Sequence, residues 1–381
     1  MKKRMISYLK RETVLCIAVL LALLSMLWVH PSRDYIDYID FRTLALLFCL
    51  MAVVAGMSRI GVFDWLAGKL LAKAKREWQI IMLLVLLCFF FGMVITNDVA
   101  LVTFVPLAII VLRRSGGIRL LIPVVAMQTI AANLGSMLTP VGNPQNLYLY
   151  GRAGISVGAF LRLTLPYGGA ALVLILIWCG MIARRSRGKE ESKQEKNTAM
   201  PEVSRIEKPG KLALYMILFV LCLLVVARLL PCAAVFIAVL VVFLIVDRGA
   251  LAQVDYALLG TFVGFFVFIG NLGQLEAFRS FLSRVMDGHE VLTAIVSSQV
   301  MSNVPAALLL SGFTENYEKL IIGVNLGGLG TLIASMASLI SFKYLAKEEG
   351  VKRGKYIGYF TASSLIFLVL ELALCACFGI L

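Results

Sequence analysis

The sequence has little of what enzymes commonly use for catalysis. Only 15% of its 381 residues are charged, and its two histidines, His30 and His289, lie far apart in expected loops. The eight cysteines fall in or beside apolar stretches and show no C-x-x-C or similar metal spacing. The chain therefore lacks the residues that a metal-dependent or histidine-based reaction needs, and we expect no enzyme activity and no bound cofactor.

The sequence also lacks a surface typical of nucleic-acid binding, although its net charge is +14. Arg and Lys gather in loops, and no basic stretch alternates with aromatic residues that could stack on bases. A secretory cleavage signal is missing too, because the first apolar run ends in Met26-Leu27-Trp28-Val29-His30-Pro31 without a small-x-small motif. We expect membrane lipid rather than nucleic acid around this chain.

Apolar residues are abundant, at 60% of the chain with a mean hydropathy of +0.92. Many runs approach the roughly 18 residues needed for a membrane span. The sequence therefore predicts an all-α polytopic membrane protein. We expect nine crossings, two of them (119–149 and 319–345) broken by polar residues; the others are 13–29, 41–57, 159–183, 211–230, 232–247, 256–273 and 356–380.

Two further apolar segments, 78–112 and 290–312, are predicted to be re-entrant helical hairpins. The arm 99–112 has 14 residues, or about 21 Å of helix. The arms of 290–312 are shorter still, whereas the hydrocarbon core is about 30 Å thick. We therefore expect the polar tips of both hairpins to stop near the middle of the membrane.

The basic residues predict the orientation. If the N-terminus is cytoplasmic, 28 of the 36 Arg and Lys residues fall on that side, in 1–11, 58–77, 113–119, 184–211, 248–255 and 343–355. The positive-inside rule favours this arrangement, with the C-terminus outside a cell (inner) membrane. The only long polar segment, 184–210, is expected to be a cytoplasmic linker.

The chain is predicted to contain two repeats of opposite orientation, 1–183 and 231–381. Each repeat would have two spans, a hairpin, a broken helix and a last span, and so an even number of crossings. The extra span 211–230 then turns the second repeat upside down. Doubled, interrupted hydrophobic segments of this kind are typical of transporter binding sites.

The hairpin tips carry matching polar triplets, Thr96-Asn97-Asp98 and Ser302-Asn303-Val304. Half-helices that begin there would expose N–H groups and a partial positive charge, which suit an anion. The broken helices carry a second pair of polar stretches, 133–146 and 325–335. Unwound carbonyls there suit Na⁺ or a proton carrier, although close helix packing through small residues is an alternative.

Two acids are expected inside the membrane. Asp98 occurs at the first tip only, because Val304 occupies the matching position. It is a candidate for binding the coupling H⁺ or Na⁺, and the alternative is a cap of the half-helix. Glu371 lies in the last span and could pair with Arg228 or face a vestibule.

The motifs T-N-D-V-A, N-L-G-S…T-P-x-G-N-P-Q-N-L, S-N-V-P-A and N-L-G-G…T-x-I-x-S resemble the ion transporter superfamily. That group includes divalent anion/sodium symporters, citrate permeases, arsenite permeases and NhaD-type antiporters. The resemblance implies a homodimer with a fixed scaffold and a moving part, an elevator-like motion, and no cofactor beyond Na⁺ or H⁺. It implies substrate binding at Thr96, Asn97, Gly142, Asn143, Asn146, Ser302, Asn303 and Thr331. It places ion coupling at Asp98, Asn133, Ser136, Thr139 and Asn325, with Na⁺ near Asn97, Asp98 and Asn303.

The sequence departs from the symporter pattern at the tips, where Thr-Asn-Asp and Ser-Asn-Val replace Ser-Asn-Thr. The second break, Thr331-Leu332-Ile333-Ala334-Ser335, is closer to arsenite permeases. The leading hypothesis is a secondary active transporter of a small inorganic oxyanion or carboxylate, coupled to Na⁺ or H⁺. The alternatives are a Na⁺/H⁺ antiporter, an arsenite-type efflux permease and, less favoured, a channel.

Overall fold

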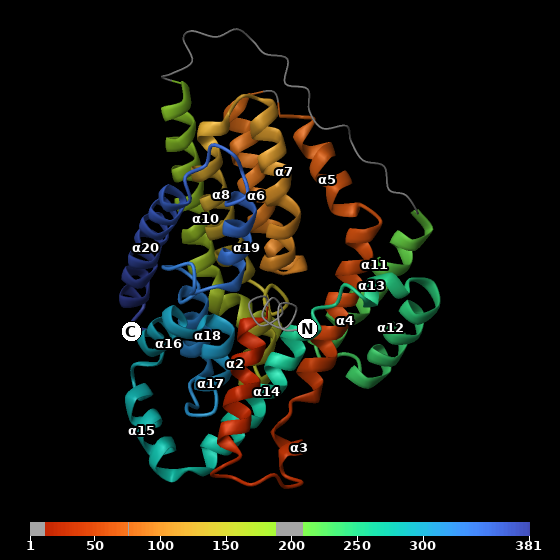
Figure 1. Ribbon diagram of the computed structural model, residues 1–381, viewed down its shortest axis with the longest axis vertical. Helices are drawn as coiled ribbons and strands as arrows, with labels where there is room; N and C mark the ends of the chain where they lie inside the picture. Colours follow the sequence, from red (N-terminus) through yellow and green to blue (C-terminus); the bar gives the residue numbers. More distant parts are fainter. Residues whose placement is uncertain (1–11, 75, 188–208) are drawn as a thin grey trace, which may run out of the picture.

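The computed structural model describes residues 12–74, 76–187 and 209–381, and all regular structure in these ranges is helical (Figure 1). The prediction of an all-α membrane protein is confirmed. Within these ranges, seven helical segments are long and apolar enough to cross a membrane. They are α4 (Phe41–Arg59), α6 (Glu77–Ile95), Ile118–Ser136 with α8 (Leu121–Ser136), α10 (Val157–Arg187), α11 (Pro209–Val226), α14 (Tyr256–Gln274) and α20 (Arg353–Cys377).

Two predicted spans form shorter helices than expected. The segment 13–29 gives α2 (Thr13–Ser25), of 13 residues, and 232–247 gives α12 (Cys232–Val246), of 15 residues. Both fall short of the roughly 20 residues that cross a bilayer. Both helices are shortened at their C-terminal ends, because the chain turns after Ser25, ahead of Pro31, and Asp247 leaves the helical conformation directly after Val246.

The two predicted hairpins differ in length. The first consists of α6, with 19 residues, and α7 (Asn97–Arg114), with 18, so its second arm is longer than the 14 residues expected. The second consists of α16 (Glu290–Met301), with 12 residues, and α17 (Asn303–Leu310), with 8. In Figure 1 the first hairpin lies in the upper half and the second in the lower half. Their re-entrant path stays a prediction.

Both broken helices are present. Helix α8 ends at Ser136 and α9 (Pro144–Ala153) follows, so residues 137–143 form the first break. Helix α18 (Tyr317–Leu326) and α19 (Met336–Leu345) flank the second break, residues 327–335. Pro144 occupies the first turn of α9, where its missing N–H leaves no hydrogen bond unmade.

A local likeness connects the two halves. Asp40 precedes α4 and Asp255 precedes α14, with φ of −78° in both and ψ of 84° and 82°. Each carboxylate accepts a 2.9 Å hydrogen bond from the N–H three residues on, of Thr43 and of Leu258. This agrees with a repeat, but its inverted orientation stays a prediction. Most of the predicted linker 184–210 lies outside the described residues, although α10 continues to Arg187.

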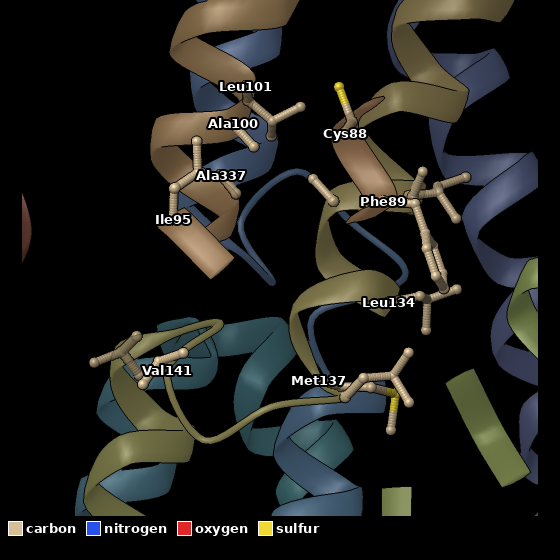
Figure 2. Close-up of a cluster of buried hydrophobic side chains, with 14 of the residues drawn as sticks. Cys88, Phe89, Ile95, Ala100, Leu101, Leu134, Met137, Val141 and Ala337 are labelled. Carbon is tan, nitrogen blue, oxygen red and sulfur yellow. The ribbon is translucent and has the colours of Figure 1, made fainter. Parts of the chain in front are cut away.

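Short helices complete the described chain. They are α3 (Tyr35–Tyr38), α5 (Val62–Leu71), α13 (Arg248–Leu251) and α15 (Glu276–Met286). The core packs tightly around the first hairpin, where Phe89 of α6 lies against Leu134 of α8 (Figure 2). A β-carbon on Gly135 would lie only 2.2 Å from the Phe89 carbonyl oxygen. Helices α6 and α8 can therefore meet this closely only because residue 135 is glycine.

We predict that Gly135→Ala forces α6 and α8 apart and lowers the free energy of unfolding by about 1–3 kcal/mol, the usual effect of overpacking. Thermal unfolding of the detergent-solubilised protein measures the loss. Gly180→Ala in α10 is the matched control, because a β-carbon there meets nothing within 4 Å. Equal stabilities of the two variants would contradict this packing.

Candidate substrate and ion site

The two hairpin tips adopt the same unusual backbone conformation. Thr96, between α6 and α7, has φ 75° and ψ 149°, and Ser302, between α16 and α17, has φ 73° and ψ 156°. Residues with a side chain seldom adopt such positive φ values, and each costs of order 1–3 kcal/mol. Strain of this kind persists only where surrounding contacts hold it and is common at ligand-binding sites.

Each tip is bound through its backbone to the break of the same half. The Asn97 N–H donates to the Gly142 carbonyl oxygen at 3.1 Å, and the Asn303 N–H donates to the Ala334 carbonyl oxygen at 3.0 Å. These N–H groups begin α7 and α17, where a helix has no internal acceptor for them. The broken helices therefore satisfy the helix starts at the tips.

Asn133, at the end of α8, joins the first tip to the second break. Its side-chain oxygen accepts 3.0 Å hydrogen bonds from the Asn97 amide and the Ser335 hydroxyl. The backbone N–H of Asp98 donates to the side-chain oxygen of Asn97 at 3.0 Å. The Asn97 side chain thereby caps α7 and is fixed in orientation at both ends of its amide.

Asn325, the counterpart of Asn133 at the end of α18, contacts the first break and the start of α9. Its amide donates to the Asn146 side-chain oxygen at 2.6 Å, and its oxygen accepts from the Asn143 amide at 3.0 Å. Asn143 also donates to the Ser136 hydroxyl at 3.1 Å, and Asn146 donates to the carbonyls of residues 136, 137 and 139. These buried side chains hold the first break in shape.

The tips converge on a cavity of about 20 Å³. Its volume suits a single water molecule or a small cation, so a larger solute requires the tips to move apart. The lining comes from both tips, the second break, and the N-terminal ends of α9, α14 and α19. The polar residues are Asn97, Asp98, Gln145, Asp255, Asn303 and Ser335, and the others are Pro144, Leu258, Val304, Met336 and Ala337.

The structure thus brings Asn97, Asp98 and Asn303 together at the cavity, and the other candidates are not among its lining residues. Thr96 and Ser302 form the tips. The Thr139 hydroxyl donates to the Met93 carbonyl oxygen, and the Thr331 N–H donates to the Gln299 side-chain oxygen at 3.0 Å. Gly142 contributes the carbonyl that binds the first tip, while Ser136, Asn133, Asn143, Asn146 and Asn325 belong to the networks behind it.

Sequence reasoning missed Asp255, Gln145 and Ser335 as cavity residues. The position of Asp255 directly before an apolar run indicates a helix cap, and it does cap α14. The sequence gives no sign that Asp255 lines the same cavity as Asp98, because tertiary packing brings the two acids together. Glu371 does not pair with Arg228, which was one of the two expectations for it. The Arg228 guanidinium donates instead to the carbonyl oxygens of Gly154 (2.8 Å) and Tyr150 (3.5 Å).

A model of the citrate transporter family matches residues 5–318. The chain belongs to this family. It is 30% identical to an uncharacterised transporter of Methanocaldococcus jannaschii over 342 residues, and this alignment covers 90% of both chains. It is 33% identical over 313 residues to inner membrane protein YbiR of Escherichia coli, or 80% of both chains. An uncharacterised transporter of Mycobacterium tuberculosis is 26% identical over 269 residues, or 67% of this chain and 62% of that one.

Family membership agrees with the resemblance found in the sequence. The protein is a multi-pass membrane transporter of the citrate transporter family, with seven candidate spans among its described residues.

We predict that Asn325→Ala lowers the free energy of unfolding by about 1–3 kcal/mol, because it removes the partner of the buried Asn146 side-chain oxygen and one of the two hydrogen bonds of the Asn143 amide. Thermal unfolding in detergent measures the change. The matched control is Gln253→Ala, at an exposed residue between α13 and α14. Stability equal to that of the control would show that the amide network does not hold the break.

Proposed function

We propose that the protein is a secondary active transporter of a small anion, an inorganic oxyanion or a carboxylate, coupled to Na⁺ or H⁺. The substrate is held between the tip of α6–α7 and the tip of α16–α17. One observation carries the proposal: two tips from different halves, with the same backbone conformation, face one cavity. The N-termini of α7 and α17 supply the partial positive charge that favours an anion.

The side chains of the cavity add the requirement for a coupling ion. Asp98 and Asp255 both line it, whereas none of its lining residues is Arg or Lys. An anion entering alone would meet uncompensated carboxylates, so a cation or proton must bind with it. Binding of the two is then linked, and each raises the affinity for the other by the same factor.

The same two carboxylates support a second candidate, a Na⁺/H⁺ antiporter that uses Asp98. An arsenite-type efflux permease, whose substrate carries little charge, is also compatible with an acidic cavity. A channel is less favoured, because the cavity takes only a single water molecule or small ion. In each case we propose a homodimer, a cytoplasmic N-terminus, an external C-terminus and an elevator-like alternating access of the substrate site.

We predict that Asp98→Asn reduces the dependence of anion binding on Na⁺ or H⁺, because it deletes one of the two cavity carboxylates that the coupling ion neutralises. Thermal shift against a panel of small anions, with and without Na⁺ and at several pH values, measures the dependence. Asp287→Asn, at an exposed turn, is the control. Unchanged coupling in Asp98→Asn would exclude the proposed role.

We predict that Asn97→Ala and Asn303→Ala each weaken anion binding by roughly 10-fold or more, the loss expected for one hydrogen bond to a charged group. Uptake by proteoliposomes separates the candidates. A symporter takes up the anion only with its coupling ion, an antiporter collapses a pH gradient when Na⁺ is added without anion, and a channel shows uncoupled flux. Normal affinity in both variants would place the substrate elsewhere.

A further inference from the structure

Away from the tips, one acid of α20 is buried without any partner. The Glu371 side chain has 0% exposure, and neither of its carboxyl oxygens has a hydrogen-bond partner. The buried Tyr167 hydroxyl of α10 lies near this acid and has the Cys375 thiol as its neighbour. Buried polar atoms normally have partners, so the two carboxyl oxygens of Glu371 require an explanation.

No cation compensates this acid. The helices packed against α20 are α8, α10 and α19. Helix α8 contains no charged residue, and the only charged residue of α19, Lys343, is exposed in its last turn. Also exposed are the arginines of α10 whose side chains are described, Arg162, Arg184 and Arg185. The titratable groups that interact with Glu371 are the Tyr167 hydroxyl from α10 and the Cys375 thiol from α20 itself. Among the described residues no ion pair includes Glu371.

An ionised carboxylate in these surroundings would cost several kcal/mol, and nothing nearby offsets that cost. A bound proton removes the charge and allows the packing that is observed. A leucine at this place would pack without any such penalty, so a purely structural role does not account for the acid. Ionisable residues inside membrane-spanning segments commonly belong to ion or proton pathways.

Helix α20, which carries Glu371, and its neighbour α10 each form a hydrogen bond to one of the two breaks. The Ser364 hydroxyl, two turns earlier on the same face of α20, accepts a 2.8 Å hydrogen bond from the Gly330 N–H of the second break. On α10, the Thr164 hydroxyl donates to the Leu138 carbonyl oxygen of the first break at 3.4 Å. A change between α10 and α20 at Glu371 therefore acts on both breaks, and through them on both tips.

We propose that Glu371 binds a coupling proton at a site separate from the substrate cavity. The inference rests on the proposed function and assigns a residue to its coupling ion. Binding forms one O–H bond on a carboxyl oxygen with a proton taken from water, and release returns that proton to water on the other side. The protonated acid keeps α10 and α20 packed as observed, and the charged acid admits water between them.

Infrared difference spectroscopy of the purified protein tests the site itself. A protonated carboxyl gives a C=O band that a carboxylate lacks. We expect a band that Glu371→Gln abolishes, that the exposed control Glu276→Gln retains, and that declines as the pH is raised. A spectrum unchanged by Glu371→Gln, or a Glu371 band that does not change with pH, would overturn the proposal.

Uptake by proteoliposomes tests the coupling. Glu371→Gln is expected to bind the anion in the thermal-shift screen but to lose stimulation of uptake by a pH gradient, and Glu371→Asp to retain part of it. Stimulation at the wild-type level in Glu371→Gln would overturn the coupling role while leaving the transporter intact. Absence of any solute uptake by the wild-type protein would instead defeat the proposed function, and the infrared band would still decide the proton site.

Discussion

Two backbone hydrogen bonds determine the rest of this structure: Asn97 N–H to the Gly142 carbonyl, and Asn303 N–H to the Ala334 carbonyl. A helix that begins inside a membrane has N–H groups that lipid cannot satisfy, so protein must supply the acceptors. Here each acceptor comes from a helix that is itself broken. Each tip and its break therefore require one another, and both must be buried together.

Burial of this arrangement explains the amide networks behind the tips. A break leaves carbonyl groups without helical partners, and the Asn146 amide donates to three of them. Asn133 and Asn325 then join each half to the break of the other. The Asn133 network fixes the position of Asn97, and the Ala334 carbonyl holds Asn303. The carboxylates of Asp98 and Asp255 stay at the cavity, where we propose that the coupling ion binds.

The sequence predicted the elements that depend on residues close together in the chain. Pro140, Gly142 and Pro144 cannot continue a helix, so the first break was predictable, and the polar triplets marked both tips. The full length of α7 and the shortness of α2 could not be predicted, because turns and packing determine where those helices end. Asp255 was missed for a similar reason: its distance from Asp98 along the sequence gives no sign that both face one cavity.

If the two tips form one binding site, the bound solute must touch both of them. A cryo-electron microscopy map of the protein with a transported anion and its coupling ion at saturating concentration shows whether it does. We expect density for the solute in contact with both Asn97 and Asn303. Solute density elsewhere, or a map that places Asn97 and Asn303 at opposite membrane surfaces with no cavity between them, would contradict it.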